Sequence, residues 1–239
     1  SWTITLVLGV EIYAVLAEAL EMVNTSGFIS SGSLKGVTAN RNITAFSLAI
    51  KIPFVLYLIY SLKKGSLKIV LSVLVFFTIL GLSMIQSRAS FIATGLILVS
   101  YTILHLYLYI KKERKISQLL QIRFFVAPLV LALVVNQMVI ADKGADALSR
   151  AATISVSTND GSVNQRLRYY EDVLTHMKSN PILGTGLGNW KLKSIDYDSK
   201  DIIGYVVPYH AHSDFIQLGA ELGIIGFLLY LGVFLWAVY

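Results

Sequence analysis

Long apolar stretches are the feature of this sequence that most constrains its fold. The charged residues lie in clusters, and the segments between them reach roughly 18 residues or more, enough to cross a hydrocarbon core about 30 Å thick. Only 14% of the 239 residues are charged, against about 25% in a typical soluble domain. Helices satisfy their backbone polar groups within one segment, which a bilayer requires. The sequence therefore predicts an all-α, polytopic integral membrane protein.

About six segments are predicted to span the membrane. They cover residues 2–20, 43–62, 68–86, 90–110, 122–141 and 214–239. The first is the weakest because Glu11 and Glu18 interrupt it, and ionisable groups at that depth are expected to face protein or a wet cavity. Residues 21–42 are predicted to form a loop. Both ends of the chain lie in apolar runs, so we expect residues 1–239 to be a fragment of a single, longer polytopic membrane domain.

The short loops predict the orientation of the chain. Basic residues gather after the second span and after the fourth, namely at Lys63, Lys64, Lys68, Lys111, Lys112, Arg114, Lys115 and Arg123. Cytoplasmic loops carry such an excess, so both loops are predicted to be cytoplasmic. Residues 142–211 then form one long loop on the opposite side. Within it, residues 162–180 carry Leu167, Tyr170 and Leu174 at helical spacing and are predicted to form an amphipathic helix.

Composition excludes some kinds of chemistry. The chain has no cysteine, so it can form neither a disulfide framework nor a thiolate metal site. The net charge of +6 is explained by membrane topology better than by nucleic-acid binding, because many of the basic residues lie in two short loops.

A histidine pair precedes the last predicted span. Ser213 suits the N-cap of that span, and the positive end of a helix dipole favours a neutral histidine, which can act as a base near pH 7. An interfacial histidine without chemistry is an equally open interpretation. A metal site of His210 and His212 with Asp196 or Asp198 is a weaker one, because no third ligand has an informative spacing.

Arginines and a glycine-rich segment are further candidates. Arg88 lies at the end of an apolar span, where it either binds an anion or extends to the membrane surface. Arg166 and Arg168 lie in the amphipathic helix, and Arg166 shares a face with Tyr170. Residues 184–190 are glycine-rich but neither follow a strand nor open a helix, so a tight turn is predicted rather than a nucleotide-binding loop.

Four motifs, in this order, carry a resemblance to the O-antigen ligase and O-antigen polymerase superfamily of bacterial envelopes. They are Gly36-Val37-Thr38-Ala39-Asn40-Arg41-Asn42, then Ser87-Arg88-Ala89-Ser90, then Arg166 and Tyr170 with Asn180-Pro181-Ile182-Leu183-Gly184-Thr185-Gly186, and finally His212-Ser213 with Gly223-Ile224-Ile225-Gly226. The sequence departs from the family at Tyr170, where tryptophan is frequent, and at Arg41, where proline is common.

The resemblance implies a multi-pass protein of the bacterial inner membrane, with a GT-C-like helical fold and an active site facing the periplasm. It implies transfer of a glycan from an undecaprenyl-diphosphate carrier to a hydroxyl of a lipid A core, another glycan or a protein. The mechanism would be inverting and would use no metal or other cofactor, and no nucleic acid would take part. Ligases and polymerases share the four motifs, so both activities stay open.

The resemblance also implies roles for individual residues. His212 would be the base that removes the acceptor proton, and Arg88 and Arg166 would hold the diphosphate. Further substrate-binding candidates are Arg168, His210, Arg41, Asn40 and Tyr170.

Two other hypotheses compete with the transferase. A transporter or flippase of lipid-linked glycan would use the same arginines as a binding path, together with the ionisable residues Lys51, Glu11, Glu18 and Glu221 in the spans. A membrane scaffold or sensor without catalysis would tolerate substitution of both His212 and Arg88.

Overall fold

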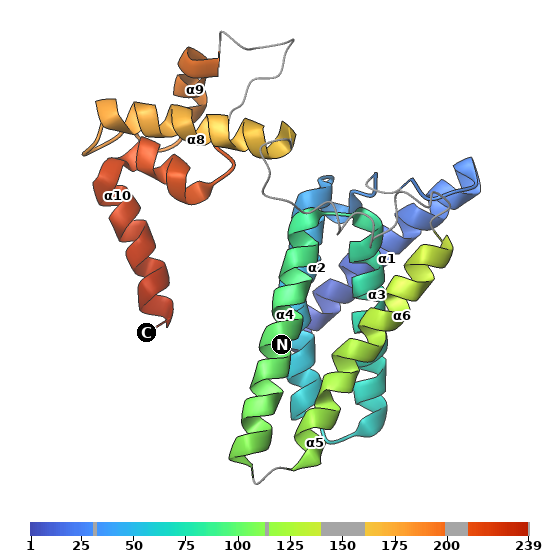
Figure 1. Ribbon diagram of the computed structural model, residues 1–239. Helices are drawn as coiled ribbons and strands as arrows, with labels where there is room; N and C mark the ends of the chain where they lie inside the picture. Colours follow the sequence, from blue (N-terminus) through green and yellow to red (C-terminus); the bar gives the residue numbers. More distant parts are fainter. Residues whose placement is uncertain (31–32, 113–114, 140–160, 199–209, 239) are drawn as a thin grey trace. The chain divides into compact units, whose positions relative to one another are not determined.

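The computed structural model describes residues 1–30, 33–112, 115–139, 161–198 and 210–238, and the regular structure within these ranges is helical (Figure 1). The chain divides into two compact units, Ser1–Ile154 and Ser155–Tyr239. Unit 1 holds helices α1 to α6, and unit 2 holds helices α8 to α10.

Within the described ranges, six helical segments are long and apolar enough to cross a membrane, which confirms the predicted all-α polytopic fold. They are α1 (Trp2–Ser26), α2 (Arg41–Ser61), α3 (Gly65–Ile85), α4 (Arg88–Lys111), the segment Ile116–Val139 and α10 (Asp214–Val238). The fifth segment consists of α5 (Ile116–Leu119), the 3-10 turn η2 (Leu120–Ile122) and α6 (Arg123–Val139).

Helix α1 is longer than predicted. The loop predicted over residues 21–42 is wrong for residues 21–26, which continue the helix. Gly27 ends it in a left-handed conformation with φ of 79°, and its N–H donates to the carbonyl oxygen of Val23 at 2.9 Å. Glycine adopts this conformation without steric cost, so Gly27 can cap the end of the helix in this way.

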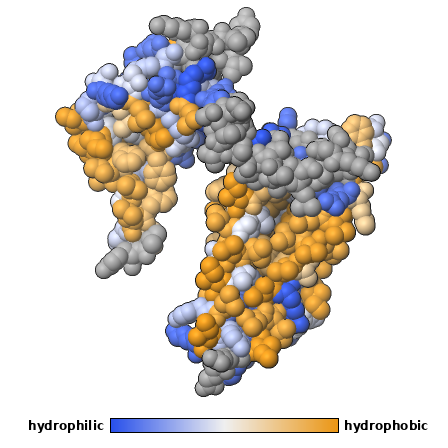
Figure 2. Space-filling model, viewed as in Figure 1, coloured by the Kyte–Doolittle hydropathy of each residue, from blue (hydrophilic) through white to orange (hydrophobic). Residues whose placement is uncertain are grey.

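Helix α3 is central to unit 1 and packs against α1, α2 and α6. Its side chains Val75 and Ile79 are buried, as are Leu48 and Ile52 of α2, and the four-residue spacing places each pair on one helix face. Van der Waals contact rather than water exclusion holds such faces together in lipid. Figure 2 shows apolar side chains over much of the visible outer surface of these helices, as a lipid-facing surface requires.

Both basic clusters lie at the same end of unit 1. Lys112, after α4, donates from Nζ to the hydroxyl of Tyr60 near the end of α2 at 3.1 Å. Lys68, near the start of α3, donates to Oε1 of Gln121 at 3.4 Å. The loops after α2 and α4 therefore meet, as alternating spans predict. The assignment of this basic end to the cytoplasm stays a prediction.

Unit 2 is built from α8 (Gly161–Ser179), α9 (Trp190–Asp198) and α10, each of which contacts the other two. Helix α8 confirms the helix predicted over residues 162–180 to within one residue at each end. Helix α10 is broken at Gly223, where φ is 65° and ψ is −167°. The small core of the unit includes Val173, Trp190 and Ala220.

Candidate active site

The four motifs are divided between the two units. Residues 36–42 and 87–90 belong to unit 1 and lie where α2 and α4 begin, at the helix ends opposite the basic loops. Residues 180–186 and 212–226 belong to unit 2, with Arg166 and Tyr170 of α8. Each unit therefore carries two of the four motifs.

Arg88 is the first residue of α4 and follows a very short turn. Gln86 caps α3 in the left-handed conformation, with φ of 56°. Its N–H donates a hydrogen bond to the carbonyl oxygen of Leu82 at 3.2 Å. Ser87 and Ser90 are buried, and the Ser90 hydroxyl donates to the Ser87 carbonyl oxygen at 2.7 Å. Arg88 itself is half-buried. A cation at a helix N-terminus meets the positive end of the dipole, so both the guanidinium and the helix favour an anion here.

Asn40 and Arg41 begin α2 in a similar way. The Asn40 side-chain oxygen accepts from the N–H groups of Asn42 at 3.0 Å and Ile43 at 3.4 Å, which makes Asn40 the N-cap. Arg41 is the first helical residue and is exposed. A second cation therefore lies at a helix start in unit 1.

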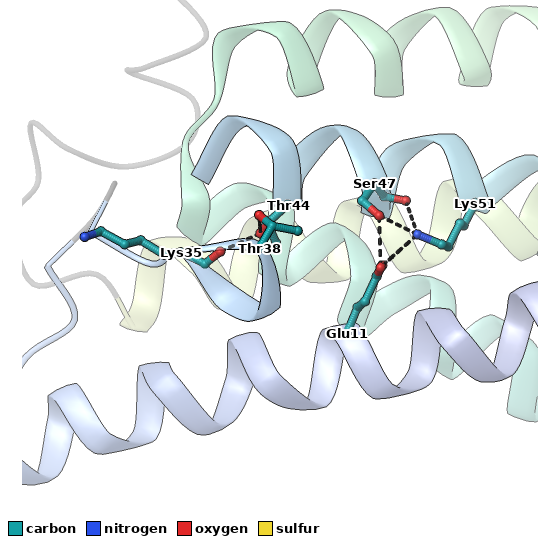
Figure 3. A network of polar contacts seen from close by, with 6 residues as sticks. All are labelled: Glu11, Lys35, Thr38, Thr44, Ser47 and Lys51. Atoms are coloured by element: carbon teal, nitrogen blue, oxygen red, sulfur yellow. Dashed lines mark hydrogen bonds and ion pairs between the residues drawn. The ribbon is translucent and has the colours of Figure 1, made fainter. Parts of the chain in front are cut away.

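The loop before Asn40 is held by a glutamate of α1. Oε2 of Glu18 accepts from the N–H groups of Lys35 at 3.0 Å and Gly36 at 2.7 Å. The hydroxyl of Thr44 donates a hydrogen bond to the Lys35 carbonyl oxygen. The same hydroxyl shares a hydrogen bond with the Thr38 hydroxyl at 2.7 Å (Figure 3). Glu18 thus serves as an anchor for the first motif.

A second glutamate of α1 forms an ion pair inside the span. Oε2 of Glu11 lies 2.8 Å from Nζ of Lys51, and Oε1 accepts from the Ser47 hydroxyl at 2.9 Å (Figure 3). Both charged side chains are largely buried, with 16% and 15% of their surface exposed. The expectation that ionisable groups in this span face protein is confirmed for Glu11, and its contacts link α1 to α2.

His212 lies two residues before α10, in a left-handed backbone conformation with φ of 56°. The Ser213 carbonyl oxygen accepts the first helical hydrogen bond, from Gln217 N–H at 2.9 Å, which confirms Ser213 at the start of the helix. Partial burial lowers the pKa of His212, and the positive charges of Arg166 and His210 lower it further. The neutral imidazole is therefore the favoured form near pH 7.

The ring of Tyr169 stacks on His212, with 5.8 Å between ring centroids and 23° between the planes. Tyr169 is buried, and the guanidinium of Arg168 lies over its ring at 5.9 Å. The neighbouring Tyr170 donates from its hydroxyl to the His212 carbonyl oxygen at 3.5 Å. Unit 2 therefore brings the predicted residues Arg166, Arg168, Tyr170, His210 and His212 together around one tyrosine that the sequence analysis did not name.

The buried face of α8 differs from the predicted apolar stripe. Leu167 and Leu174 are about half exposed, whereas Tyr169, Val173 and His176 are buried. His176 packs against the ring of Trp190 at 5.6 Å, and its Nδ1 shares a hydrogen bond with the Tyr197 hydroxyl at 3.1 Å. Contacts with α9 thus select a face containing tyrosine and histidine. The i, i+4 and i+7 spacing of these residues is the signal that could have identified it.

The glycine-rich segment docks on the break in α10. The N–H groups of Thr185 and Gly186 donate to the carbonyl oxygens of Ala220 at 3.1 Å and Glu221 at 2.7 Å, and Ile224 N–H donates to the Pro181 carbonyl oxygen at 2.8 Å. The backbones approach so closely that a Cβ at Gly184 would lie 2.5 Å from the Ala220 carbonyl oxygen. The predicted tight turn is confirmed, and the turn joins the third motif to the fourth. The expectation that residues 184–190 do not open a helix is wrong, because α9 begins at Trp190.

A buried carboxylate connects this turn to the histidine segment. Glu221 is 3% exposed and accepts from Gly188 N–H at 2.8 Å and Trp190 N–H at 3.3 Å. Gln217 donates to Glu221 at 3.1 Å and accepts from Ala211 N–H at 3.2 Å. Gln217 and Glu221 are four residues apart on α10, which is the spacing that could have indicated their contact. Together they support the backbone beside His212.

The hypothesis of a metal site gains no support from the described residues. Among them, no three histidine, aspartate or glutamate side chains converge on one point. Asp196 instead pairs with Lys193, with 3.5 Å between Oδ2 and Nζ. The Asp198 side chain lies outside the described residues.

A model of a known protein family matches this chain. Residues 70–231, more than half of the chain, match a family described as O-antigen ligase. The matched region holds the second, third and fourth motifs, whereas residues 36–42 lie before it. No curated protein and no solved structure matches the chain significantly.

Proposed function

Because the chain belongs to the O-antigen ligase family and is a membrane enzyme of the ligase or polymerase type, we propose that it transfers a glycan from an undecaprenyl-diphosphate carrier to an acceptor hydroxyl. The acceptor is a sugar of a lipid A core, another lipid-linked glycan or a protein hydroxyl. The enzyme lies in the bacterial inner membrane, and its site faces the periplasm.

The environment of His212 is the observation that carries this proposal. A base must be neutral to accept a proton, and partial burial together with Arg166 and His210 lowers the pKa of His212. The ring is positioned by stacking on Tyr169, and the adjacent backbone is held through Ala211 and Gln217. The residue remains exposed, so an acceptor hydroxyl can reach it.

In the proposed reaction, His212 takes the proton of the acceptor hydroxyl. The acceptor oxygen forms a bond to the anomeric carbon of the donor sugar from the face opposite the diphosphate. The bond between that carbon and the diphosphate oxygen breaks, and the electron pair leaves with the diphosphate. Inversion at the anomeric carbon follows from this single displacement.

The arginines supply positive charge for the leaving group. Arg88 lies at the first residue of α4, and Arg166 lies on α8 close enough to His212 to affect its pKa. Guanidinium groups bind phosphate oxygens in a two-pronged geometry, and their charge stabilises the diphosphate as it departs. The further residues proposed to contact the two substrates are Asn40 and Arg41 in unit 1 and Arg168, Tyr170 and His210 in unit 2.

The direct test is transfer by the purified full-length protein with a lipid-linked donor and acceptor. We expect His212→Ala and Arg88→Ala each to lower the rate by about 100-fold or more. Arg123→Ala is the matched control, because it removes an arginine from the basic end of unit 1 and should leave the rate unchanged. Full activity of both site variants, at normal levels in the membrane, would refute the mechanism.

A deletion of the gene separates ligase from polymerase. A cell lacking a ligase accumulates long glycan that is not attached to its acceptor, whereas a cell lacking a polymerase attaches single repeats. Transport without transfer would yield no new glycosidic bond in the purified system. The transport hypothesis relied on ionisable residues in the spans, but Glu11, Glu18 and Glu221 have hydrogen-bond partners within their own units.

A further inference from the structure

Unit 1 contains an apolar cavity between α2 and α4, in the half of these helices that leads to the basic end. Its volume is about 380 Å³, within the range of about 300–1,000 Å³ typical of ligand pockets. The side chains that line it include Pro53, Leu56, Leu96 and Leu104. Along α4 the cavity begins at Leu96, about 12 Å from Arg88, and continues to His105, about 26 Å from Arg88.

One polar side chain in this cavity has no protein partner among the described residues. His105 lines the cavity and is fully buried, and neither of its ring nitrogens has a hydrogen-bond partner there. Its ring instead packs against Tyr101 at 4.4 Å and Tyr60 at 5.6 Å. Buried polar groups in lipid are costly unless they are satisfied, so the histidine favours an occupant that carries a hydrogen-bonding group.

The cavity also has a cation beside it. Lys112 is exposed and donates from Nζ to the hydroxyl of Tyr60, whose ring lines the cavity and packs on His105. Lys111 and Lys115 lie near Lys112 in the same basic loop. Along the cavity toward the membrane surface, a ligand would therefore contact apolar side chains, next the His105 ring, and finally the positive charge of Lys112.

From this sequence of surfaces we propose that the cavity between α2 and α4 binds one acyl chain of an anionic phospholipid. The chain occupies the apolar cavity, a glycerol ester oxygen accepts from the His105 N–H, and the phosphate lies beside Lys112. Basic pockets between membrane helices bind anionic headgroups by this charge complementarity. The site is separate from the glycan-transfer site and does not depend on the proposed reaction.

Lipid retention by the purified full-length protein tests this site. Native mass spectrometry with equal amounts of phosphatidylglycerol and phosphatidylcholine should show preferential retention of phosphatidylglycerol. One lysine near a membrane surface changes such binding by about fivefold, so Lys112→Gln should reduce the preference by about that factor. Lys115→Gln is the matched control, since it removes the same charge from the same loop without a contact to the cavity lining, and should have little effect.

A cavity-filling variant provides an independent readout. Ser100 lines the cavity, so Ser100→Trp should displace the lipid, whereas Val99→Trp adds the same ring outside the lining and should not. Equal retention of the two phospholipids, equal effects of the two lysine variants, or retention by Ser100→Trp would overturn the proposal. Displacement of phosphatidylglycerol by stoichiometric polyprenyl phosphate would also overturn it, because the cavity would then hold the carrier chain.

Discussion

Gly223→Ala is predicted to separate the glycine-rich turn from α10. A Cβ at this position would lie 2.1 Å from the Ile182 carbonyl oxygen and 2.3 Å from the carbonyl carbon, and both are backbone atoms. The backbone of Gly223 also has φ of 65° and ψ of −167°, a conformation that is essentially restricted to glycine and costs a residue with a Cβ about 1–3 kcal/mol. The substitution therefore introduces both a clash and a strained backbone.

The cost of Gly223→Ala can be estimated from these contacts. Relief of the clash requires the turn to move, which weakens the hydrogen bond from Ile224 N–H to the Pro181 carbonyl oxygen at 2.8 Å. A hydrogen bond of this kind contributes about 0.5–1.5 kcal/mol. Together with the backbone cost, we expect a loss of about 2–4 kcal/mol in the free energy of unfolding. The transfer rate should fall too, because the same turn contacts Glu221, which supports the segment before His212 through Gln217.

Thermal unfolding of the purified protein in detergent, together with the transfer assay, measures both effects. Gly232→Ala is the matched control, because Gly232 lies in the same helix and a Cβ there meets no heavy atom within 4 Å. Alanine is favoured over glycine in a helix, so the control should melt at or above the wild-type temperature. The reasoning fails if Gly223→Ala melts like the wild type or if Gly232→Ala is destabilised equally.

Two further outcomes concern individual ionisable groups. The transfer rate should fall with decreasing pH along a limb whose midpoint lies below 6.5, because protonation of His212 removes the base. His210→Gln should raise that midpoint, since it removes a cation that lowers the pKa of His212, and an unmoved midpoint in the pH–rate profile would contradict this. In thermal unfolding, Lys51→Met should cost about 3 kcal/mol because it leaves Glu11 without its ion-pair partner. Adding Glu11→Gln should recover most of that loss, whereas simple additivity of the two single variants would show that the pair is not coupled.

The membrane spans could be predicted from the sequence because length and hydropathy decide them. A run of apolar residues that can cross a bilayer has few alternatives to a helix. The end of α1 was less predictable, because the polar residues before Gly27 tolerate a helix as readily as a loop. A left-handed glycine ends the helix there, and the sequence contains other glycines that do not.

The buried face of α8 could not be predicted from the apolar residues alone. The spacing of the leucines indicated one buried face of the helix. The helix instead buries Tyr169 and His176, because Trp190 and Tyr197 of α9 pack there. The i, i+4 and i+7 spacing of the buried residues is a local signal, but it competes with the apolar stripe, and only the contacts with α9 decide between the two faces. Tyr169 was missed for the same reason, although its neighbour Tyr170 was named from the resemblance.

The role of Glu221 was also inaccessible to local pattern analysis. An acidic residue in an apolar span indicates a functional path in general. Here the carboxylate accepts from backbone N–H groups of Gly188 and Trp190, more than thirty residues earlier in the chain. Only the fold brings those donors to α10, and Gly223 at the break allows the close approach of the backbone of Ile182 and Leu183 in the same turn.

The acidic and basic residues discussed above differ in a way that bears on function. Glu11 in the spans and Glu221 in α10 have partners that link helices or hold loops, so their charges serve the fold. Arg41 and Arg88 instead begin helices, where the dipole opposes a positive charge and where stability alone would favour an acidic residue. Local rules are broken most often at functional sites. An anionic substrate such as the proposed lipid diphosphate would offset the unfavourable interaction between each arginine and the helix dipole at both helix starts. This gives a physical reason for arginine at these two positions.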